Sequence, residues 1–290
     1  MKTVGISIKL GDARATAVAV ELIDWLRQQG KTVCIDDSLQ EICGDYCTSL
    51  DEMPSNVDLM LVLGGDGTLL TVARHFIGSE TPILGVNLGR LGFLTETPVG
   101  DMFKAVATVL AGRGEVVRHF SLHAEAWRNG EMITSGHAIN DVVLQRNRHP
   151  RMIEFEMRVA GHFVFRVRAD GLVLATPAGS TAYALSAGGP IVHPGLDAIT
   201  VAPVCPHILS NRPIVLPASE SISLRLTEMP APGALNLDGQ MRMELQEDDE
   251  IRVCKADTIS LAYLPGRNYY NVLRNKLHWT GRADKETHDE

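Results

Sequence analysis

The first third of the chain alternates between short apolar runs and longer segments in which apolar residues recur at helical spacing. Four apolar runs predict strands at Val4–Ile8, Thr32–Ile35, Asp58–Leu63 and Pro82–Val86. Helical spacing of apolar residues predicts helices at 13–29, 68–76 and 101–111. Strands that alternate with helices in this way form a parallel sheet. The pattern therefore predicts an α/β N-terminal domain with a doubly wound, mostly parallel sheet.

From about residue 116 the pattern changes to a period of two, in which apolar and polar residues alternate. This alternation is typical of half-buried antiparallel strands. It occurs at Phe120–Ala126, Ile153–Val159, Phe163–Val167, Ile222–Leu226 and Met241–Leu245. It predicts an all-β C-terminal domain over residues 116–265. Helical spacing returns at Tyr269–Trp279, so we expect a C-terminal helix that packs back onto the first domain, which comprises residues 1–115 and 266–290.

Composition and charge narrow the class of protein. Hydrophobic residues make up 45% of the 290 residues and charged residues 21%, the usual mixture for a folded globular chain. The 27 basic and 35 acidic residues give a net charge of −8, so the chain lacks the broad positive surface of most nucleic-acid-binding proteins. We expect no nucleic-acid partner, and a phosphate-rich ligand must be bound by a local site.

Cysteine content and the N-terminal sequence bear on the compartment. The chain has 5 cysteines, an odd number, and we expect reduced thiols in a cytoplasmic protein, with Cys43 and Cys47 as ordinary thiols. The sequence becomes polar at Lys9, too early for a secretion signal, and no apolar run approaches the ~18–20 residues of a membrane span. We therefore expect no association with a membrane.

The sharpest motif is Gly64-Gly65-Asp66-Gly67-Thr68, where a buried strand gives way to a helix. Glycines let the backbone approach a bulky anion closely, and the first amides of the helix can face phosphate oxygens. A lone carboxylate in such a loop repels phosphate unless it accepts a proton from an attacking hydroxyl or holds a divalent metal. The alternative is a tight turn in which Asp66 caps the helix.

Two further segments lie where predicted strands end, the first after Pro82–Val86 and the second where a predicted strand at Leu172–Ala175 runs into small polar residues. Segment 85–94 carries Gly85, Gly89 and Gly92 and then Phe93, which is either a core residue or a platform for a ring. Two such loops at the carboxyl edge of a parallel sheet line the crevice where α/β folds bind ligands. Segment 170–190 is dense in glycine, serine and threonine, which leave room for a ligand and orient it, while Tyr183 can stack on a ring.

Together these motifs resemble those of the bacterial NAD kinases. The resemblance covers about residues 58–279 and rests on Gly64–Thr68, Asn87, Gly89, Gly92 and Phe93, Asn140-Asp141, the 170–190 block, Pro203–Pro213 and Asp238-Gly239-Gln240. The 170–190 block is the most specific part, because phosphofructokinases, diacylglycerol kinases and sphingosine kinases share versions of the glycine-aspartate loop. The resemblance implies that the γ-phosphoryl group of ATP passes to the 2′-hydroxyl of the adenosine ribose of NAD, with Mg²⁺ or Mn²⁺ bound to ATP.

The resemblance also implies roles for individual residues. Asp66 is the general base, and Gly64, Gly65, Gly67 and Thr68 cradle the donor phosphates. The positions that match NAD contacts are Asp66, Gly67, Phe93, Asn140, Asp141, Arg151, Arg168, Asp170, Thr181, Ala182, Tyr183, Ala184, Leu185, Ser186 and Gln240. The first domain then serves the phosphate donor and the second binds NAD. Relatives are homodimers or homotetramers, so we expect a homo-oligomer.

Several alternatives remain open at this stage. Arg151 and Arg168 either face the ligand and supply positive charge or lie on a solvated strand face. Asp141 stands where relatives often carry glutamate, so its carboxylate reaches about one methylene less far. The alternative functions are a lipid or sugar kinase with the same loop and a nucleotide-binding sensor without catalysis.

Overall fold

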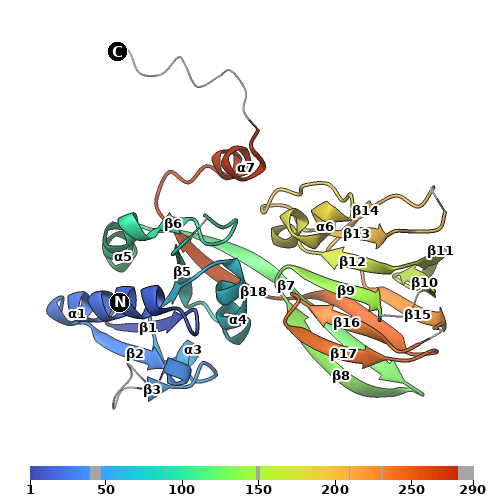
Figure 1. The fold of residues 1–290 in the computed structure, drawn as a ribbon, viewed down its shortest axis with the longest axis horizontal. Coiled ribbons are helices and arrows are strands. Elements are labelled where there is room, and N and C mark those ends of the chain that lie inside the picture. The colour runs from blue at the N-terminus through green and yellow to red at the C-terminus, as the bar shows by residue number, and fades with distance from the viewer. Residues whose placement is uncertain (40–46, 90, 148–150, 209, 230, 280–290) are drawn as a thin grey trace. The chain divides into compact units, whose positions relative to one another are not determined.

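A computed structural model of the protein describes residues 1–39, 47–89, 91–147, 151–208, 210–229 and 231–279 (Figure 1). The chain forms two compact units, which are described separately. The first comprises Met1–His75, Thr81–Val117 and Ser260–Glu290, and the second comprises Phe76–Glu80 and Arg118–Ile259. The C-terminal helix therefore belongs to the first unit, which confirms its expected return to the α/β domain.

The sheet of the first unit is parallel, as predicted. Its order is β5-β4-β1-β2-β3, and β6 and the last residues of β18 also pair with β5 in parallel. The strands are β1 (Thr3–Ile8), β2 (Thr32–Asp36), β3 (Cys47–Thr48), β4 (Leu59–Leu63), β5 (Pro82–Asn87), β6 (Thr97–Pro98) and β18 (Glu250–Tyr263). Every residue of β4 is buried, as its uninterrupted apolar run predicts for a central strand.

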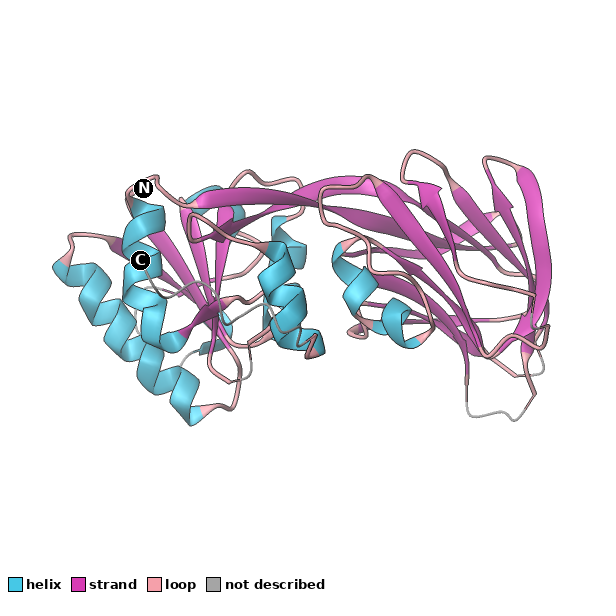
Figure 2. Ribbon diagram, turned by 90° about the horizontal axis from the view of Figure 1, so that it is seen from above, coloured by secondary structure: helices cyan, strands magenta, loops and turns pink. Residues whose placement is uncertain are grey.

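Helices cover both faces of this sheet (Figure 2). They are α1 (Ala13–Gln28), α3 (Met53–Asn56), α4 (Asp66–Ala73), α5 (Met102–Leu110) and α7 (Tyr269–Leu277), with 3₁₀ turns η1 (Asp37–Leu39), η2 (Arg74–Phe76) and η3 (Val99–Asp101). Residues of α1 and α5 share one core with the strands. Leu69 of α4 lies against Gly85 on β5, and it takes no part in that core. The sheet is therefore doubly wound.

The order of the strands places two loops at one edge of the sheet. From β1 the chain proceeds outward to β2 and β3, and it then returns to β4 on the other side of β1. In doubly wound sheets, ligands bind at the carboxyl ends of the strands where the order reverses in this way. The loops that follow β4 and β5, Gly64–Gly65 and Leu88–Glu96, lie at those ends.

The second unit consists of antiparallel strands, as predicted. One sheet has the order β14-β13-β12-β9-β16-β17. The other contains β11-β10-β15-β18, with β7 paired to β18 and β8. The remaining strands are β7 (Glu115–Arg128), β8 (Glu131–Ala138), β9 (Asp141–Arg146), β10 (Ile153–Val159), β11 (His162–Ala169), β12 (Gly171–Ala175), β13 (Ala198–Val204), β14 (Ile214–Pro217), β15 (Ile222–Glu228), β16 (Gly233–Leu237) and β17 (Met241–Leu245).

One hydrophobic core joins the two sheets of this unit. On β9, Val142 and Leu144 point into that core. The opposite face of the six-stranded sheet carries a smaller apolar cluster that includes Val143, Val173 and Ala184. Ala184 comes from α6 (Tyr183–Ser186), which follows the 3₁₀ turn η4 (Ala178–Thr181). Strands such as β12 and β13 are apolar on both faces because both faces are covered, so they lack the alternation that predicts a strand.

Two findings concern the cysteines and the membrane. Cys34, Cys205 and Cys254 are free thiols, but Cys47 is disulfide-bonded, so the expectation of a reduced thiol at this position is wrong. The prediction failed because it rested on the number of cysteines in the whole chain, which does not show whether one particular cysteine forms a disulfide. Cys43 lies outside the described residues. Among the described helices, none has the length and apolar character that a membrane crossing requires.

Candidate active site

Asp66 is held by the loop that follows the neighbouring strand. It is the first residue of α4, but it makes no capping bond to that helix, whose N-cap is Gly65. Its Oδ2 accepts the amide of Phe93 at 2.8 Å. Its Oδ1 accepts the amides of Leu94 and Thr95 at 3.1 and 2.9 Å and the Thr95 hydroxyl at 2.8 Å. The carboxylate is therefore fixed by four donors, and helix capping does not explain it.

At two positions of this site glycine is required because the surrounding atoms pack closely, and not because the backbone has an unusual conformation. A side-chain carbon on Gly92 would lie 1.9 Å from Asp66 Oδ1, and one on Gly64 would lie 2.6 Å from the Thr68 hydroxyl. Neither glycine has a positive φ. Gly65 and Gly67 differ from them, because a carbon added there meets no described atom within 4 Å. Open space at Gly65 and Gly67 leaves their backbone accessible to a bulky group.

A second set of bonds stiffens the loop that holds Asp66. The Asn87 amide group donates to the Thr95 hydroxyl at 2.9 Å, and its carbonyl oxygen accepts the Gly89 amide at 2.8 Å. The hydroxyl of Thr95 in turn donates to Asp66. Asn87 and Thr95 are both buried, so these bonds replace water. The segment from Asn87 to Thr95 therefore acts as one support for the carboxylate.

The C-terminal segment of the first unit touches this support at two places. Arg267 donates to Glu96 Oε1 from Nε at 2.8 Å and from Nη2 at 2.6 Å, and its guanidinium lies 4.1 Å from the ring centroid of Tyr263. Burial raises the pKa of Glu96, the bond from Arg267 opposes that rise, and the charge of Asp66 adds to it. Farther along, the Lys276 ammonium lies 5.4 Å from the ring centroid of Phe93.

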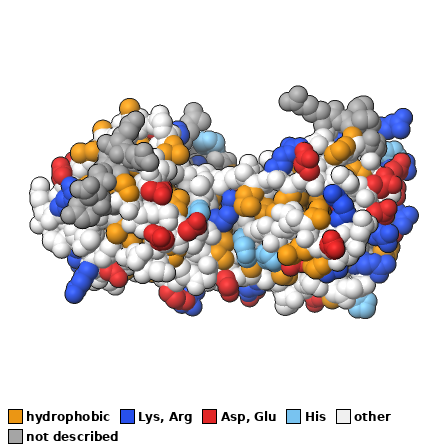
Figure 3. Space-filling view, turned by 90° about the horizontal axis from the view of Figure 1, so that it is seen from below, with side chains coloured by type: hydrophobic (Ala, Val, Ile, Leu, Met, Phe, Trp, Pro, Cys, Tyr) orange, Lys and Arg blue, Asp and Glu red, His pale blue; other side chains and the backbone are white. Residues whose placement is uncertain are grey.

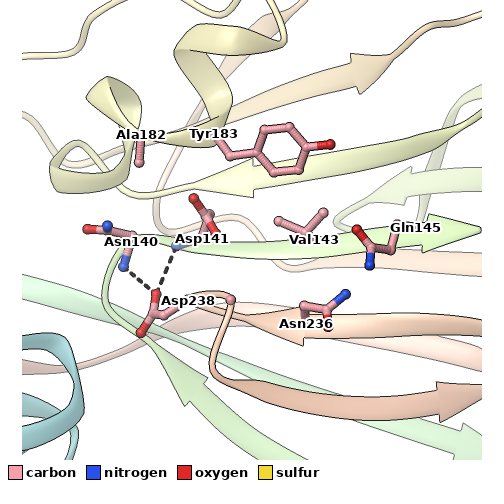
Figure 4. Close-up of a pocket in the computed structure, with 9 residues that line it drawn as sticks. Asn140, Asp141, Val143, Gln145, Ala182, Tyr183, Asn236 and Asp238 are labelled. Carbon is pink, nitrogen blue, oxygen red and sulfur yellow. Dashed lines mark hydrogen bonds between the residues drawn. The ribbon is translucent and has the colours of Figure 1, made fainter. Parts of the chain in front are cut away.

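The second unit contains a pocket of about 370 Å³. Its lining residues are Asn140, Asp141, Val143, Gln145, Ala182, Tyr183, Asn236, Asp238 and Gly239. Figure 4 shows the ring of Tyr183 over β9, on the side toward which Asp141 and Val143 point. Oδ1 of Asn140 and Nδ2 of Asn236 are buried with no hydrogen-bond partner among the described residues. Buried polar groups normally have partners, so these two atoms indicate a ligand that donates one bond and accepts another.

Asp238 organises the entrance to β9. It lies in the turn between β16 and β17 with a positive φ of 52°. Its carboxylate accepts the amides of Ile139, Asn140 and Asp141 at 3.0, 2.7 and 3.1 Å. These three bonds fix the backbone that presents the side chains of Asn140 and Asp141 to the pocket (Figure 4).

Asp141 is the most perturbed acid of the pocket. Burial raises its pKa to about 7, the nearby charge of Asp238 adds to the rise, and a bond from the Tyr183 backbone amide opposes it. The side chain is almost completely buried. This carboxyl group therefore titrates near neutral pH.

This pKa gives a test of the pocket without its ligand. The folded pKa lies above the unfolded value of about 4, so the folded protein holds an extra proton between about pH 4 and pH 7 and loses stability as the pH rises through that window. Asp141→Asn removes the titrating group. Between pH 5 and pH 8, the urea unfolding free energy of the variant will rise relative to the wild type by up to about 3 kcal/mol. Equal differences for Asp141→Asn at pH 5 and pH 8 would contradict the assignment.

A second pocket of about 390 Å³ adjoins the first through Gln145 and Tyr183. It is lined by Gln145, Arg146, Asn147, Asp170, Gly171, Tyr183, Val204 and Arg242. Arg146 Nε donates to Asp170 Oδ1 at 2.6 Å, so the charge of this carboxylate is balanced within the pocket. Tyr183 therefore borders two neighbouring pockets, each large enough for part of a drug-sized ligand.

The hydroxyl groups of the 170–190 block form more hydrogen bonds with backbone groups of the protein than we expected. Thr176 donates to the Ile139 carbonyl at 2.6 Å, and Ser180 donates to the Pro177 carbonyl at 2.6 Å and accepts the Val192 amide at 3.0 Å. A side-chain carbon on Gly179 would lie 2.0 Å from the Asn140 carbonyl oxygen. The small residues thus bring Gly179 against Asn140 and fix the turn that carries Tyr183.

The structure brings together only part of the expected site in the second unit. Asn140, Asp141, Ala182 and Tyr183 line the first pocket, and Asp170 lines the second. The other expected residues of this block and turn, which line neither pocket, are Thr181, Ala184, Leu185, Ser186 and Gln240. Val143, Gln145, Asn236 and Asp238 were missed. Val143 and Gln145 could have been found from their spacing. They follow Asp141 at intervals of two residues, so the three side chains lie on one face of β9.

Both expected arginines lie outside these pockets. Arg151 is exposed just before β10. Arg168 on β11 pairs with Glu154 at 2.9 Å and with Glu228 at 2.5 Å, and its side chain is 58% exposed. Of the two alternatives for Arg168, a position on a solvated strand face matches its environment. Figure 3 shows one face of the molecule, on which acidic and basic side chains are interspersed. This face therefore carries no broad positive surface.

The described residues contain no group of three or more histidine, cysteine, aspartate or glutamate side chains that could hold a metal ion. A divalent cation therefore lacks a ready-made set of protein ligands in that part of the chain. Asp66 itself offers one oxygen with spare capacity, since Oδ2 accepts a single hydrogen bond.

Comparison with known proteins shows the same family in both halves of the chain. The model of the ATP-NAD kinase N-terminal domain matches residues 4–114, and that of the ATP-NAD kinase C-terminal domain matches residues 139–263. A curated NAD kinase of Magnetococcus marinus is 42% identical over 285 residues, which cover 96% of this chain and 94% of that protein. One of Geobacter metallireducens is 42% identical over 283 residues, covering 97% and 100%.

Two solved structures are also similar. Yeast NADH kinase in complex with NADH superposes with a TM-score of 0.89 and 28% identity, covering 98% of this chain and 90% of that chain. An NAD kinase from Archaeoglobus fulgidus in complex with ATP gives a TM-score of 0.74 and 24% identity, covering 97% and 100%. At 24% identity the second likeness shows the fold alone.

Proposed function

Because this chain belongs to the ATP-NAD kinase family, we propose that its NAD kinase activity, which transfers the γ-phosphoryl group of ATP to the 2′-hydroxyl of the adenosine ribose of NAD, depends on Asp66 as general base. The products are NADP and ADP, so the enzyme supplies NADP. The observation that carries the proposal is the hold on the Asp66 carboxylate by four donors.

The distribution of these donors assigns the two oxygens different roles. Oδ1 accepts three hydrogen bonds and has no good position left, whereas Oδ2 accepts one from Phe93. Oδ2 therefore receives the proton of the ribose 2′-hydroxyl as the oxygen attacks phosphorus. Phosphoryl transfer passes through a loose transition state, so alignment and charge neutralisation matter more than basicity. A carboxylate that cannot rotate provides this alignment.

The donor phosphates bind at the start of α4. Gly65 and Gly67 have open space where a side chain would lie, and they stand at the N-terminal end of α4. An anion there gains hydrogen bonds and the favourable end of the helix dipole. Gly64 and Thr68 support this loop by packing on each other. We propose that Mg²⁺ or Mn²⁺ arrives bound to ATP, where it offsets the charge of the phosphates.

NAD binds in the second unit. The adenine edge carries both donors and acceptors, which match the unpartnered Asn140 Oδ1 and Asn236 Nδ2. Tyr183 stacks beside the base, and Asp141 faces the same pocket. The neighbouring pocket with Asp170 and Arg146 takes the other half of the dinucleotide. The exposed Phe163 and Val164 of β11 support the further proposal of a homodimer or homotetramer. We also propose a cytoplasmic location.

The experiment is a purified-protein assay with NAD, ATP and Mg²⁺. Formation of NADP with release of ADP is the expected result, and its absence under conditions where the protein is folded would overturn the proposal. A sensor without catalysis predicts binding of NAD and no NADP.

A further inference from the structure

Phosphoryl transfer needs positive charge beside the moving group, because negative charge spreads over its three oxygens. The chain carries a net charge of −8, so this positive charge must be local. Arg168 is occupied by Glu154 and Glu228. Arg267, although near Asp66 in the first unit, is occupied by Glu96. Beside the metal ion proposed to arrive with ATP, a side-chain cation can supply part of this charge, and Lys276 of the first unit lies next to the segment that holds Asp66.

Lys276 on α7 is placed beside the residue that holds Asp66. Its ammonium lies 5.4 Å from the ring centroid of Phe93, and the amide of Phe93 donates to Asp66 Oδ2 at 2.8 Å. The oxygen that we assign as proton acceptor and this ammonium are thus linked through one residue. A lysine side chain is long and flexible, so its charge can follow a group that moves near its resting place.

The charge of Lys276 is not neutralised by a neighbour within the described part of the chain. Among those residues no carboxylate lies within 4.0 Å of its nitrogen, whereas Lys9 pairs with Asp12 and Lys255 with Asp197. The lysine is also half-buried. A partly desolvated ammonium without a counter-ion is costly unless an anion joins it during function.

The helix that carries Lys276 is capped and tied to its surroundings at its start. Asn268 caps α7 by accepting the amides of Tyr270 and Asn271 at 2.9 and 3.4 Å. Val272 and Leu273 are buried. Directly before the cap, Arg267 donates two hydrogen bonds to Oε1 of Glu96 and ties the segment to the loop that holds Asp66. The start of α7 is therefore tied to the loop that carries Phe93, and Lys276 lies beside that residue.

We propose that Lys276 is a further catalytic residue, whose ammonium contacts the phosphoryl group as it passes from ATP to the ribose. The proposal rests on the proposed function. In the step, the bond between phosphorus and the oxygen bridging to the β-phosphate breaks while the bond to the 2′-oxygen forms. The hydroxyl proton goes to Asp66, ADP leaves with the bridging oxygen, and Lys276 stays protonated throughout.

The test compares Lys276→Met, which keeps most of the stem, with Lys276→Arg, which keeps the charge. Loss of one electrostatic contact to a transition state predicts that Lys276→Met lowers kcat by roughly 10- to 100-fold. Because the contact belongs to the transfer step, the KM for NAD will stay within about twofold of the wild type. Lys276→Arg will keep kcat within about fivefold, because a guanidinium also binds phosphate. A merely structural lysine would show loss of thermal stability in Lys276→Met without this split between kcat and KM.

Lys104→Met is the matched control, since Lys104 lies exposed on α5 of the same unit, and it will leave kcat unchanged. A kcat for Lys276→Met within about threefold of the wild type would overturn the role of Lys276. Equal losses in Lys276→Met and Lys276→Arg would overturn it as well. A wild-type protein that forms no NADP from NAD and ATP would instead refute the proposed function, so the two failures are distinguishable.

Discussion

Asp66→Asn lowers the turnover of NAD by about 10²- to 10⁴-fold, the range found for general acid–base groups. Asparagine has nearly the same shape, but its amide group cannot take the proton of the 2′-hydroxyl. The affinity for NAD stays close to that of the wild type, because the proposed pocket for the dinucleotide lies in the second unit. Steady-state kinetics with NAD and ATP measure both quantities.

The bonds of Asp66 also predict how this variant changes stability. If the asparagine oxygen takes the place of Oδ1, where three donors meet, the new NH₂ group faces the amide of Phe93. Two donors then oppose each other, which costs about 1–3 kcal/mol. Asp58→Asn is the control, because Asp58 also accepts two backbone amides, those of Lys2 and Thr3. It will affect stability but not turnover. Turnover of Asp66→Asn within tenfold of the wild type would refute the general base.

Gly92→Ala will lower kcat by about 100-fold or more, although it removes none of the side chains proposed to take part in the reaction. The added carbon would lie 1.9 Å from Asp66 Oδ1 and 2.3 Å from the Thr95 hydroxyl, so the carboxylate must move. A displacement of about 1 Å is sufficient for a loss of this size in a reaction that depends on alignment. The measurement is kcat at saturating NAD and ATP.

A matched substitution separates this displacement from a general effect of alanine. Gly100→Ala places its carbon in open space in the same unit, and Gly100 has no positive φ. It will therefore leave kcat unchanged. Binding of NAD by Gly92→Ala, measured by calorimetry, will remain because the proposed pocket belongs to the other unit. A Gly92→Ala enzyme with normal kcat would show that the hold on Asp66 is unimportant for catalysis.

The sequence predicted β1, β2, β4 and β5 and the four longer helices of the first unit because each is determined locally, and it missed the short β3, α3 and β6. The run Leu59–Leu63 is apolar throughout and forms a buried strand, and the glycines after it mark the turn. The hold on Asp66 could not be predicted in the same way. Its donors are mostly backbone amides of residues 27 to 29 positions away in sequence, and an amide leaves no trace in the residue type. The sequence therefore identified the carboxylate and left its partners unknown.

In the second unit the alternating pattern predicted β7, β10, β11, β15 and β17, and the apolar run Leu172–Ala175 predicted β12, whereas β9, β13 and β16 were missed. The same limit applies to the pocket. Asn140 and Asp141 were expected from the resemblance, whereas Asn236 enters the pocket only because β16 pairs with β9, placing Asn236 opposite Val143. Arg168 shows the reverse case, since the residue type suggested a phosphate partner and the neighbouring strands supply Glu154 and Glu228 instead.

The support of Asp66 by backbone amides has a consequence for which substitutions the enzyme can tolerate. An amide is present in every residue except proline, so the bonds from positions 93 and 94 do not depend on the side chains there. Leu94 can therefore be exchanged for other apolar residues at the cost of packing alone. Gly92 and the Thr95 hydroxyl have no such freedom. Natural variation near the catalytic aspartate can thus accumulate at some positions without moving the carboxylate.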